Sequence, residues 1–171
     1  AARTLRYEWF EALVQKKHYD WVLTAHHADD NIETLLINIT RGTGIEGLTA
    51  IPKQNGKILR PLLKYHKSEI VDYAKTLGIE WRDDRSNQSD DYTRNIIRHH
   101  LIPQLTKLHP KALENTSKTI ELTKEAISVI YQQIEEFRNE LFQIREAVTH
   151  ISIKSLKTLQ PVSFWIRQLF S

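Results

Sequence analysis

The sequence predicts an α/β fold that continues into a long helix and a smaller C-terminal part. A helical pattern at the N-terminus is followed by the apolar run WVLTA at residues 21–25, and then by a second amphipathic helix. A strand between two helices is the repeating unit of α/β proteins, and a short apolar run fits a buried parallel strand. After Pro110, apolar residues recur every seven positions, which predicts one long helix.

The N-terminal part divides into short elements separated by turn residues. Residues 3–17 and residues 30–40 both carry apolar side chains at helical spacing, and Gly42 can cap the second helix. Three glycines in residues 42–47 predict a loop. The run KILRPLL at residues 57–63 predicts another short strand, which Pro61 would end.

The middle of the chain predicts two helices around a polar loop. Ser68 can cap a helix over residues 68–77, which Gly78 would close. Residues 83–91 are rich in Asp, Asn and Ser and predict an irregular loop. Residues 92–101 predict the second helix.

The long helix has one regular apolar seam and an expected length of about 35 residues, or about 50 Å. We interpret it as a packing helix or linker and not as a coiled-coil dimer, because Thr116 and Thr123 interrupt the seam. Residues 150–154 then alternate as a strand does, and residues 161–170 predict a final helix. The residues of the seam are Leu113, Ile120, Ile127, Ile134, Leu141 and Val148.

The composition excludes several classes of protein. The chain has 171 residues, 40% of them hydrophobic and 26% charged, as in ordinary globular proteins. No apolar run reaches the roughly 18–20 residues that a membrane span needs. The absence of cysteine excludes disulfides, zinc thiolate sites and cysteine nucleophiles, and it allows a cytoplasmic setting. A net charge of +3 does not by itself indicate nucleic-acid binding, although residues 53–70 contain five Lys and Arg residues against one acidic residue.

The densest polar cluster is HHADDNIE at residues 26–33, where the first strand would end and a helix would begin. Ligands bind at this edge of open α/β sheets. Asp30 and Glu33 share a helical face, so they could hold a substrate amine or a magnesium ion. The same pair also resembles a capping box. A metal-hydrolase site stays open as well, because His and Asp can ligate a metal at this spacing.

Two further motifs could bind anions. Gly42 lets backbone N–H groups approach a phosphate that Arg41 could neutralise, although helix termination also explains this glycine. Arg94 and Arg98 are four residues apart and could bind a phosphate or a carboxylate. A solvated helix face is the alternative explanation for these two arginines.

Together these motifs resemble a known family. The segment TAHHADDNIETLLINITRGTGIEGL is similar to the central signature of the tRNA(Ile)-lysidine synthetases, members of the PP-loop ATP pyrophosphatase superfamily. ARTLRY precedes it, and RPLL, WRDDRSN and RNIIRHHLIP follow in the family's order. The resemblance covers about residues 2–110. The family's SGGxDS phosphate loop is not in the sequence, so we expect a fragment that is inactive alone.

The resemblance implies a fold and a division into domains. The expected fold is a partial Rossmann-like sheet of the adenine nucleotide α-hydrolase type. Residues 1–108 would form the C-terminal part of the catalytic domain and residues 109–148 a linker helix. Residues 149–171 would begin a second, truncated domain that contacts tRNA.

The resemblance also implies an activity. The expected enzyme uses ATP and Mg²⁺ to adenylate the wobble cytidine of the isoleucine tRNA with a CAU anticodon, and free L-lysine then displaces AMP to give lysidine. A cytoplasmic location and a homodimer are further expectations. The residues that match are, for catalysis, His26, Asp30 and Arg98; for lysine, Asp30, Glu33 and Arg98; for the nucleotide, Arg41 and Gly42; and for tRNA, Arg60, Lys64 and Arg94.

Two alternatives stay open beside the metal hydrolase, a second enzyme and a protein of another class. One is another PP-loop tRNA-modifying enzyme that transfers sulfur, although such enzymes usually employ cysteines. The other is a non-catalytic tRNA-binding module that uses the basic stretch at residues 53–67 and the long helix.

Overall fold

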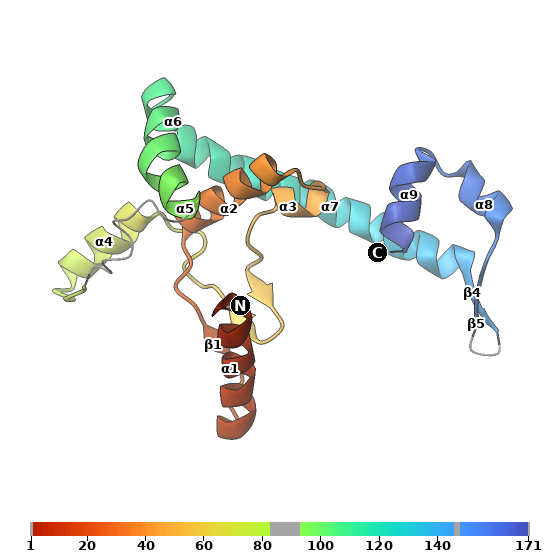
Figure 1. The fold of residues 1–171 in the computed structure, drawn as a ribbon, viewed down its shortest axis with the longest axis horizontal. Coiled ribbons are helices and arrows are strands. Elements are labelled where there is room, and N and C mark those ends of the chain that lie inside the picture. The colour runs from red at the N-terminus through yellow and green to blue at the C-terminus, as the bar shows by residue number, and fades with distance from the viewer. Residues whose placement is uncertain (1, 83–92, 146–147, 171) are drawn as a thin grey trace. The chain divides into compact units, whose positions relative to one another are not determined.

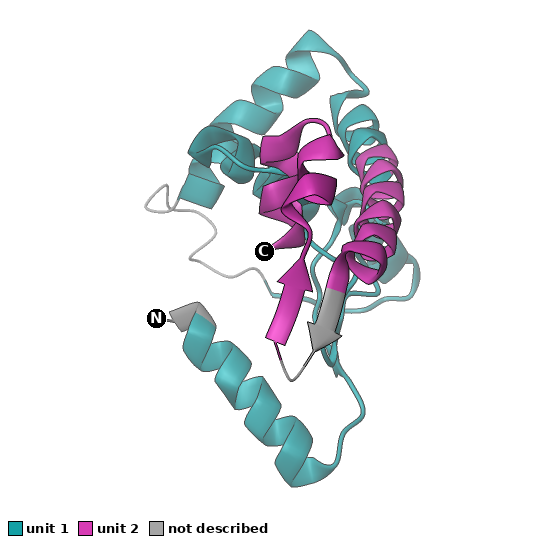
Figure 2. Cartoon of the chain, turned by 90° about the vertical axis from the view of Figure 1, so that its right-hand side faces the viewer, with its two compact units in different colours: residues 1–121 teal, residues 122–171 magenta. Residues whose placement is uncertain are grey.

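The computed structural model describes residues 2–82, 93–145 and 148–170 (Figure 1). The chain divides into two compact units, residues 1–121 and residues 122–171 (Figure 2). Each unit has its own buried side chains, and each is described in turn.

Unit 1 contains a small mixed sheet, with one parallel pair of strands, as in the predicted parallel sheet, and one antiparallel pair that was not predicted. Its strands are β1 (Val22–Leu23), β2 (Gln54–Asn55) and β3 (Ile58–Leu59), in the order β1-β3-β2. β3 is parallel to β1 and antiparallel to β2. The antiparallel pair arises because Gly56 adopts a φ of 54°, which lets β2 and β3 close as a tight hairpin.

The predicted short strand corresponds to β3, which stops just before Pro61, the residue expected to end it. It ends at Leu59, because the carbonyl of Arg60 accepts a hydrogen bond from the Leu63 N–H and the chain turns there. Pro61 has no N–H to extend a ladder. The first strand is also not fully buried: β1 lies at an edge of the sheet and Leu23 is 66% exposed.

Helix α1 (Ala2–Lys17) confirms the first predicted helix. Its buried Val14 and half-buried Tyr7 and Phe10 line a cavity together with residues of β1 and β3. The opposite face carries Leu5 and Trp9, and both side chains are exposed. The apolar spacing therefore predicts the helix but not the face that it buries. The side chains on the sheet side are Tyr7 and Phe10, which lie between the spaced positions.

Helix α2 (Ala28–Arg41) forms the centre of unit 1. Its Ile32 and Leu35 pack with Ile120, and Leu36, Leu48, Ala50, Ile102 and Leu113 surround this core. The helix ends at Gly42, whose φ is 72°. Part of the predicted glycine loop is a short helix, α3 (Ile45–Leu48).

Helix α4 (Lys67–Thr76) begins at a cap other than the one predicted. Ser68 lies inside the first turn, and His66 is the N-cap residue. The backbone N–H of His66 donates to the Glu69 carboxylate at 2.7 Å, which satisfies a group at the helix start. Gly78 follows the helix end with a φ of 64°, as predicted.

Three short helical segments follow, α5 (Thr93–Ile96), the π-helical turn η2 (Ile97–Leu101) and α6 (Ile102–Leu108). They confirm most of the helix predicted over residues 92–101. Both α5 and η2 contact α2, and Figure 1 shows α5 beside it. The loop predicted over residues 83–91 lies outside the described residues.

Helix α7 (Ala112–Leu141) confirms the long helix but ends earlier than predicted. Ile120, Ile127 and Ile134 are all buried, as expected of the apolar seam of a packing helix. At Leu141 the chain enters a hairpin of β4 (Phe142–Arg145) and β5 (Val148–Ile151). The last seam position, Val148, therefore lies in a strand and is exposed.

Unit 2 continues with α8 (Ile153–Thr158) and α9 (Val162–Leu169). The strand predicted over residues 150–154 ends at Ile151, because α8 begins two residues later. On α7, Phe137 meets Trp165 edge to face, with ring centroids 4.8 Å apart.

The C-terminal end of α9 is held by Arg138 of α7. Nη2 of Arg138 donates to the carbonyls of Gln168 and Leu169, in the last turn of the helix. Throughout the described ranges, no helix has the length and apolar character needed to cross a bilayer.

Candidate active site

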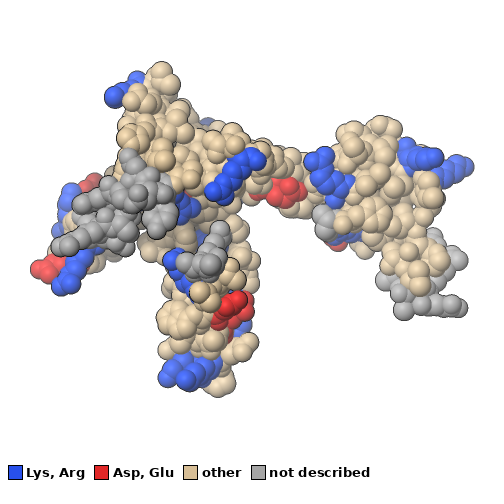
Figure 3. Space-filling view, in the orientation of Figure 1, with Lys and Arg blue, Asp and Glu red and all other residues tan. Residues whose placement is uncertain are grey.

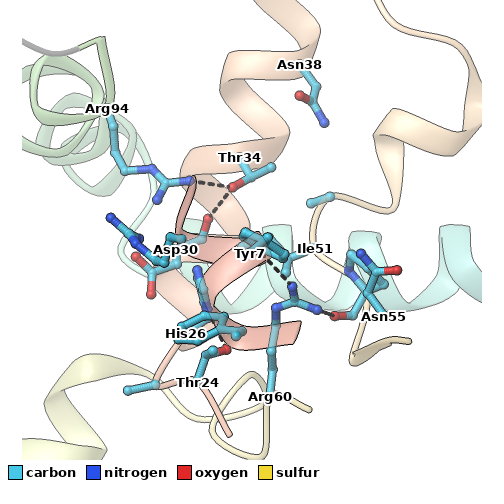
Figure 4. Close-up of a pocket in the computed structure, with 15 residues that line it drawn as sticks. Tyr7, Thr24, His26, Asp30, Thr34, Asn38, Ile51, Asn55, Arg60 and Arg94 are labelled. Carbon is cyan, nitrogen blue, oxygen red and sulfur yellow. Dashed lines mark hydrogen bonds between the residues drawn. The ribbon is translucent and has the colours of Figure 1, made fainter. Parts of the chain in front are cut away.

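A pocket of about 670 Å³ lies where β1 ends and α2 begins (Figure 4). This is the place where the polar cluster at residues 26–33 predicts a site. Four of the predicted residues line it, namely His26, Asp30, Arg60 and Arg94. Six polar residues to which the sequence assigns no role line it as well, namely Arg6, Tyr7, Thr24, Thr34, Asn38 and Asn55.

His26 follows the strand, and its half-buried ring is fixed by a neighbour. Nδ1 of His26 lies 2.9 Å from Oγ1 of Thr24. The N–H of Thr24 donates to the Leu59 carbonyl, so the sheet holds this segment in place. An imidazole in this position can accept or donate a proton.

Asp30 lies in the first turn of α2, with its carboxylate at the pocket. The carboxylate accepts a hydrogen bond from the His27 N–H at 3.0 Å, so the capping pair is His27 with Asp30 and not Asp30 with Glu33. The positive end of the helix dipole favours a negative charge here. Asp30 therefore caps the helix and also faces the pocket.

Glu33 is 1% exposed and pairs with Arg98. Nε of Arg98 donates to Oε1 at 2.7 Å, and Nη2 donates to Oε2 at 3.0 Å. This two-point geometry is the strong form of an arginine–carboxylate pair. Hydrogen bonding to Glu33 raises the pKa of Arg98 above its usual value.

The two arginines also join Glu33 to the pocket. Nη2 of Arg98 lies 3.5 Å from Oδ1 of Asp30, and Nε of Arg94 lies 3.5 Å from Oε2 of Glu33. Nη2 of Arg94 donates to the Thr34 hydroxyl at 3.0 Å (Figure 4). The structure thus brings Asp30, Glu33, Arg94 and Arg98 together as one charged network.

Asp29 carries a role that the sequence does not reveal. Its Oδ2 accepts a hydrogen bond from the Lys67 N–H at 2.6 Å, and Nδ1 of His66 lies 3.4 Å from its Oδ1. Nδ1 of His27 lies 3.3 Å from Oδ2. Burial raises the pKa of Asp29, but the hydrogen bonds to His27, Lys67 and His66 outweigh it and leave the pKa well below its usual range. The carboxylate therefore ties the start of α2 to the start of α4.

We expect Asp29→Asn to lower the free energy of unfolding by about 1–2 kcal/mol at pH 7, as loss of a charged hydrogen-bond acceptor does. Because the folded state has the lower pKa, the contribution of Asp29 is complete above its ordinary value of 3.8 and is lost as the pH falls below it. Urea unfolding at pH 7 and at pH 3 would measure this, and the variant should lose less stability between the two. A matched control is Asp72→Asn, an exposed carboxylate on α4. Equal acid sensitivity of the Asp29 variant and the parent protein would contradict the assignment.

The remaining predicted residues lie away from this network or are buried. Arg41 and Gly42 are exposed at the other end of α2, about 17 Å from Asp30 along the helix axis. Lys64 is exposed, with Nζ 4.8 Å from the centroid of the Tyr65 ring. Arg60 is 3% exposed and lines the pocket. The nucleotide and tRNA roles of these residues stay predictions.

The sequence carries a signal for only some of the pocket residues that were not predicted. Arg6 and Tyr7 belong to ARTLRY, which resembles the family but has no chemical pattern of its own. Asn38 and Asn55 have no such signal, because an isolated amide in a helix or hairpin is common. Only the fold brings them to one pocket.

The described residues do not form a metal centre of their own. No group of three or more His, Asp or Glu side chains is placed to hold a metal within those ranges. Asp30 and Glu33 face guanidinium groups, and Asp29 faces two histidines. Magnesium in nucleotide enzymes is often held by one or two carboxylates and the substrate phosphates, so these side chains alone do not supply its site.

The charges on one face of unit 1 are mixed. In Figure 3, basic side chains occur at the C-terminal end of α1, where Lys16 and Lys17 lie, and acidic side chains occur higher on the same helix. Basic and acidic side chains also both occur on α4.

Comparison with known proteins defines the class. Residues 1–105 match the family model described as the PP-loop domain, so the chain belongs to the PP-loop domain family. Among its relatives, the tRNA(Ile)-lysidine synthase of Porphyromonas gingivalis is 40% identical over 158 residues, which cover 92% of this chain and 34% of the relative. The enzyme of the same name from Chlorobaculum tepidum is 46% identical over 102 residues, 60% of this chain and 31% of the relative. That from Geobacillus kaustophilus is 32% identical over 157 residues, 90% of this chain and 34% of the relative.

These relatives confirm the resemblance seen in the sequence. The chain spans about a third of the length of the curated relatives that it matches. The PP-loop match ends within α6, before the long helix α7 begins. It therefore includes every residue that lines the pocket.

Proposed function

We propose that this chain is part of an ATP-dependent enzyme that joins L-lysine to the wobble cytidine of an isoleucine tRNA with a CAU anticodon. One observation carries the proposal: the pocket presents the Asp30 carboxylate beside His26 and the guanidinium group of Arg94. A carboxylate can hold an ammonium group and a guanidinium can hold a carboxylate, so the pocket suits an amino acid substrate. The names of the relatives support the same substrate class.

In the proposed reaction, ATP adenylates the cytidine with release of diphosphate, and the lysine side-chain amine then displaces AMP. The amine must lose a proton to attack, and Asp30 orients the ammonium before that step. His26 is placed on the same pocket wall and can take the proton. ATP and Mg²⁺ supply the activation of the cytidine.

The charged network behind the pocket has a positioning role in this proposal. Glu33 is engaged by Arg98 at two points, and Arg98 in turn lies 3.5 Å from Asp30. Glu33 therefore acts on lysine indirectly, because it holds Arg98 in place and adds negative charge to the network. Arg98 in turn fixes the position of the Asp30 carboxylate. Groups held by such contacts are preorganised for binding.

Several finer parts of the proposal concern the whole protein. We expect β1 and β3, which are parallel, to belong to a Rossmann-like sheet. We also expect nucleotide contacts at Arg41 and Gly42, tRNA contacts at Lys64 and Arg94, a cytoplasmic location and a homodimer.

The test is lysine incorporation by the full-length protein that carries this chain. With ATP, labelled lysine and the CAU isoleucine tRNA, label should enter acid-precipitable RNA. Omission of ATP, or use of the isoleucine tRNA with a GAU anticodon, should abolish the signal. A folded protein that binds ATP without incorporating lysine would contradict the proposal, and sulfur transfer to tRNA would then be measured. Binding of tRNA without either reaction would favour a non-catalytic module.

A further inference from the structure

Arg60 is a buried, positively charged residue on the wall of the pocket. It follows β3, where the sheet and the turn at Leu63 fix its backbone. Nη1 donates to the Pro52 carbonyl at 2.7 Å, and Nη2 donates to the Tyr7 hydroxyl at 3.2 Å (Figure 4). Both ends of the guanidinium group are thus held by fixed neighbours on two different segments.

The charge of Arg60 is not balanced by a carboxylate of the described chain. Its Nε is buried and has no hydrogen-bond partner there, and no ion pair involves Arg60 among those residues. Arg98 and Arg94, in contrast, both face Glu33. A buried charge without a partner is costly, so such groups in proteins are paired or bind a ligand.

The surroundings of Arg60 in the pocket favour an anion. Arg6 and Arg94 line the same wall, and Asp30 is the sole carboxylate among the described lining residues. The Asp30 carboxylate already faces Arg98 and the start of α2. The pocket therefore has more positive than negative side chains, and the Nε–H of Arg60 is among the guanidinium donors that no described residue accepts from.

We propose that Arg60 binds an oxyanion of a substrate in the pocket, and that it is not a surface contact to tRNA. The inference rests on the proposed function, in which the oxyanion is a phosphate of ATP or the carboxylate of lysine. Both present the planar or tetrahedral oxygens that a guanidinium recognises. Because Pro52 and Tyr7 hold the group in place, little side-chain freedom is lost when the anion binds.

The test compares Arg60→Met and Arg60→Lys with the parent in the full-length protein. Calorimetric titrations with ATP, with diphosphate and with L-lysine measure binding directly, without any need for turnover. Arg60→Met should weaken one class of ligand at least tenfold, and Arg60→Lys should weaken it less because the charge remains. Loss of ATP and diphosphate binding would identify a phosphate, and loss of lysine binding alone would identify the carboxylate. Lys118→Met, an exposed cation on α7, is the matched control and should bind all three ligands normally.

A second readout separates binding from a purely structural role. Diphosphate or lysine, whichever binds, should raise the thermal midpoint of the parent and of the Lys118 variant but not that of Arg60→Met. If Arg60→Met does not fold, the same comparison is made with Arg60→Lys, which should show a smaller rise than the parent. Unchanged affinity for all three ligands in a folded Arg60 variant would overturn the proposal. Failure of lysine transfer with these binding changes intact would overturn only the proposed reaction.

Discussion

Replacing Arg98 with methionine is expected to lower the free energy of unfolding by about 3 kcal/mol, as removal of one partner of a buried ion pair does. The cost arises because Glu33, only 1% exposed, would keep a buried charge and lose both of its hydrogen bonds to Arg98. Arg94 lies 3.5 Å from Glu33 and compensates only in part. Urea-induced unfolding of the full-length protein would measure the change.

A double-mutant cycle isolates the pair. Glu33→Gln alone should also destabilise the protein, because Arg98 would lose its charged acceptor. The double variant should be less destabilised than the sum of the two single variants by at least about 1 kcal/mol, because it removes both charges and leaves neither one without its partner. Strict additivity would mean that the two side chains contribute independently, contrary to the geometry.

Asp30→Asn is expected to lower kcat/KM for lysine by about 10- to 100-fold, the range of one charged hydrogen bond. The substituted amide keeps an oxygen that can accept from the His27 N–H, so α2 should keep its cap. ATP binding should change less than twofold, because the lost charge faces the amine. Initial rates of lysine incorporation at varied lysine concentration, with ATP affinity from titration, give both quantities.

The control for this variant is Asp72→Asn, an exposed acid on α4 that contacts Lys75. Its lysine kinetics should match those of the parent protein. A folded Asp30 variant with unchanged lysine kinetics would reduce Asp30 to a helix cap. A variant that lost lysine and ATP binding together would place Asp30 in the assembly of the pocket instead.

Local patterns predict the elements that depend on neighbouring residues. Helix α2 and the position of Asp30 at its start follow from a polar cluster before an amphipathic run, and both are seen in the structure. The long helix is predicted because its buried positions repeat every seven residues. The end at Leu141 is not, because Phe142–Arg145 could extend the helix and instead pairs with Val148–Ile151.

Contacts between distant segments explain what the sequence does not reveal. Asp30 and Glu33 are three residues apart on one helical face, which suggests equal roles. Glu33 is nevertheless buried, and it pairs with Arg98, 65 residues further along the chain. Arg60 belongs to a basic stretch, and composition alone cannot distinguish a surface arginine from one that reaches Pro52 and Tyr7. His66 replaces Ser68 as a cap, since the neighbouring Lys67 N–H bonds to Asp29 on another helix.

The separation of 65 residues between Glu33 and Arg98 has a consequence for folding kinetics. The helices α2 and α7 can form early, because their hydrogen bonds are local, but the pair forms only after a long loop closes. Until this loop closes, the charges of Glu33 and Arg98 both remain hydrated, so there is no desolvation cost. The charged network behind the pocket is therefore completed late in folding, after the helix α2 that carries Glu33.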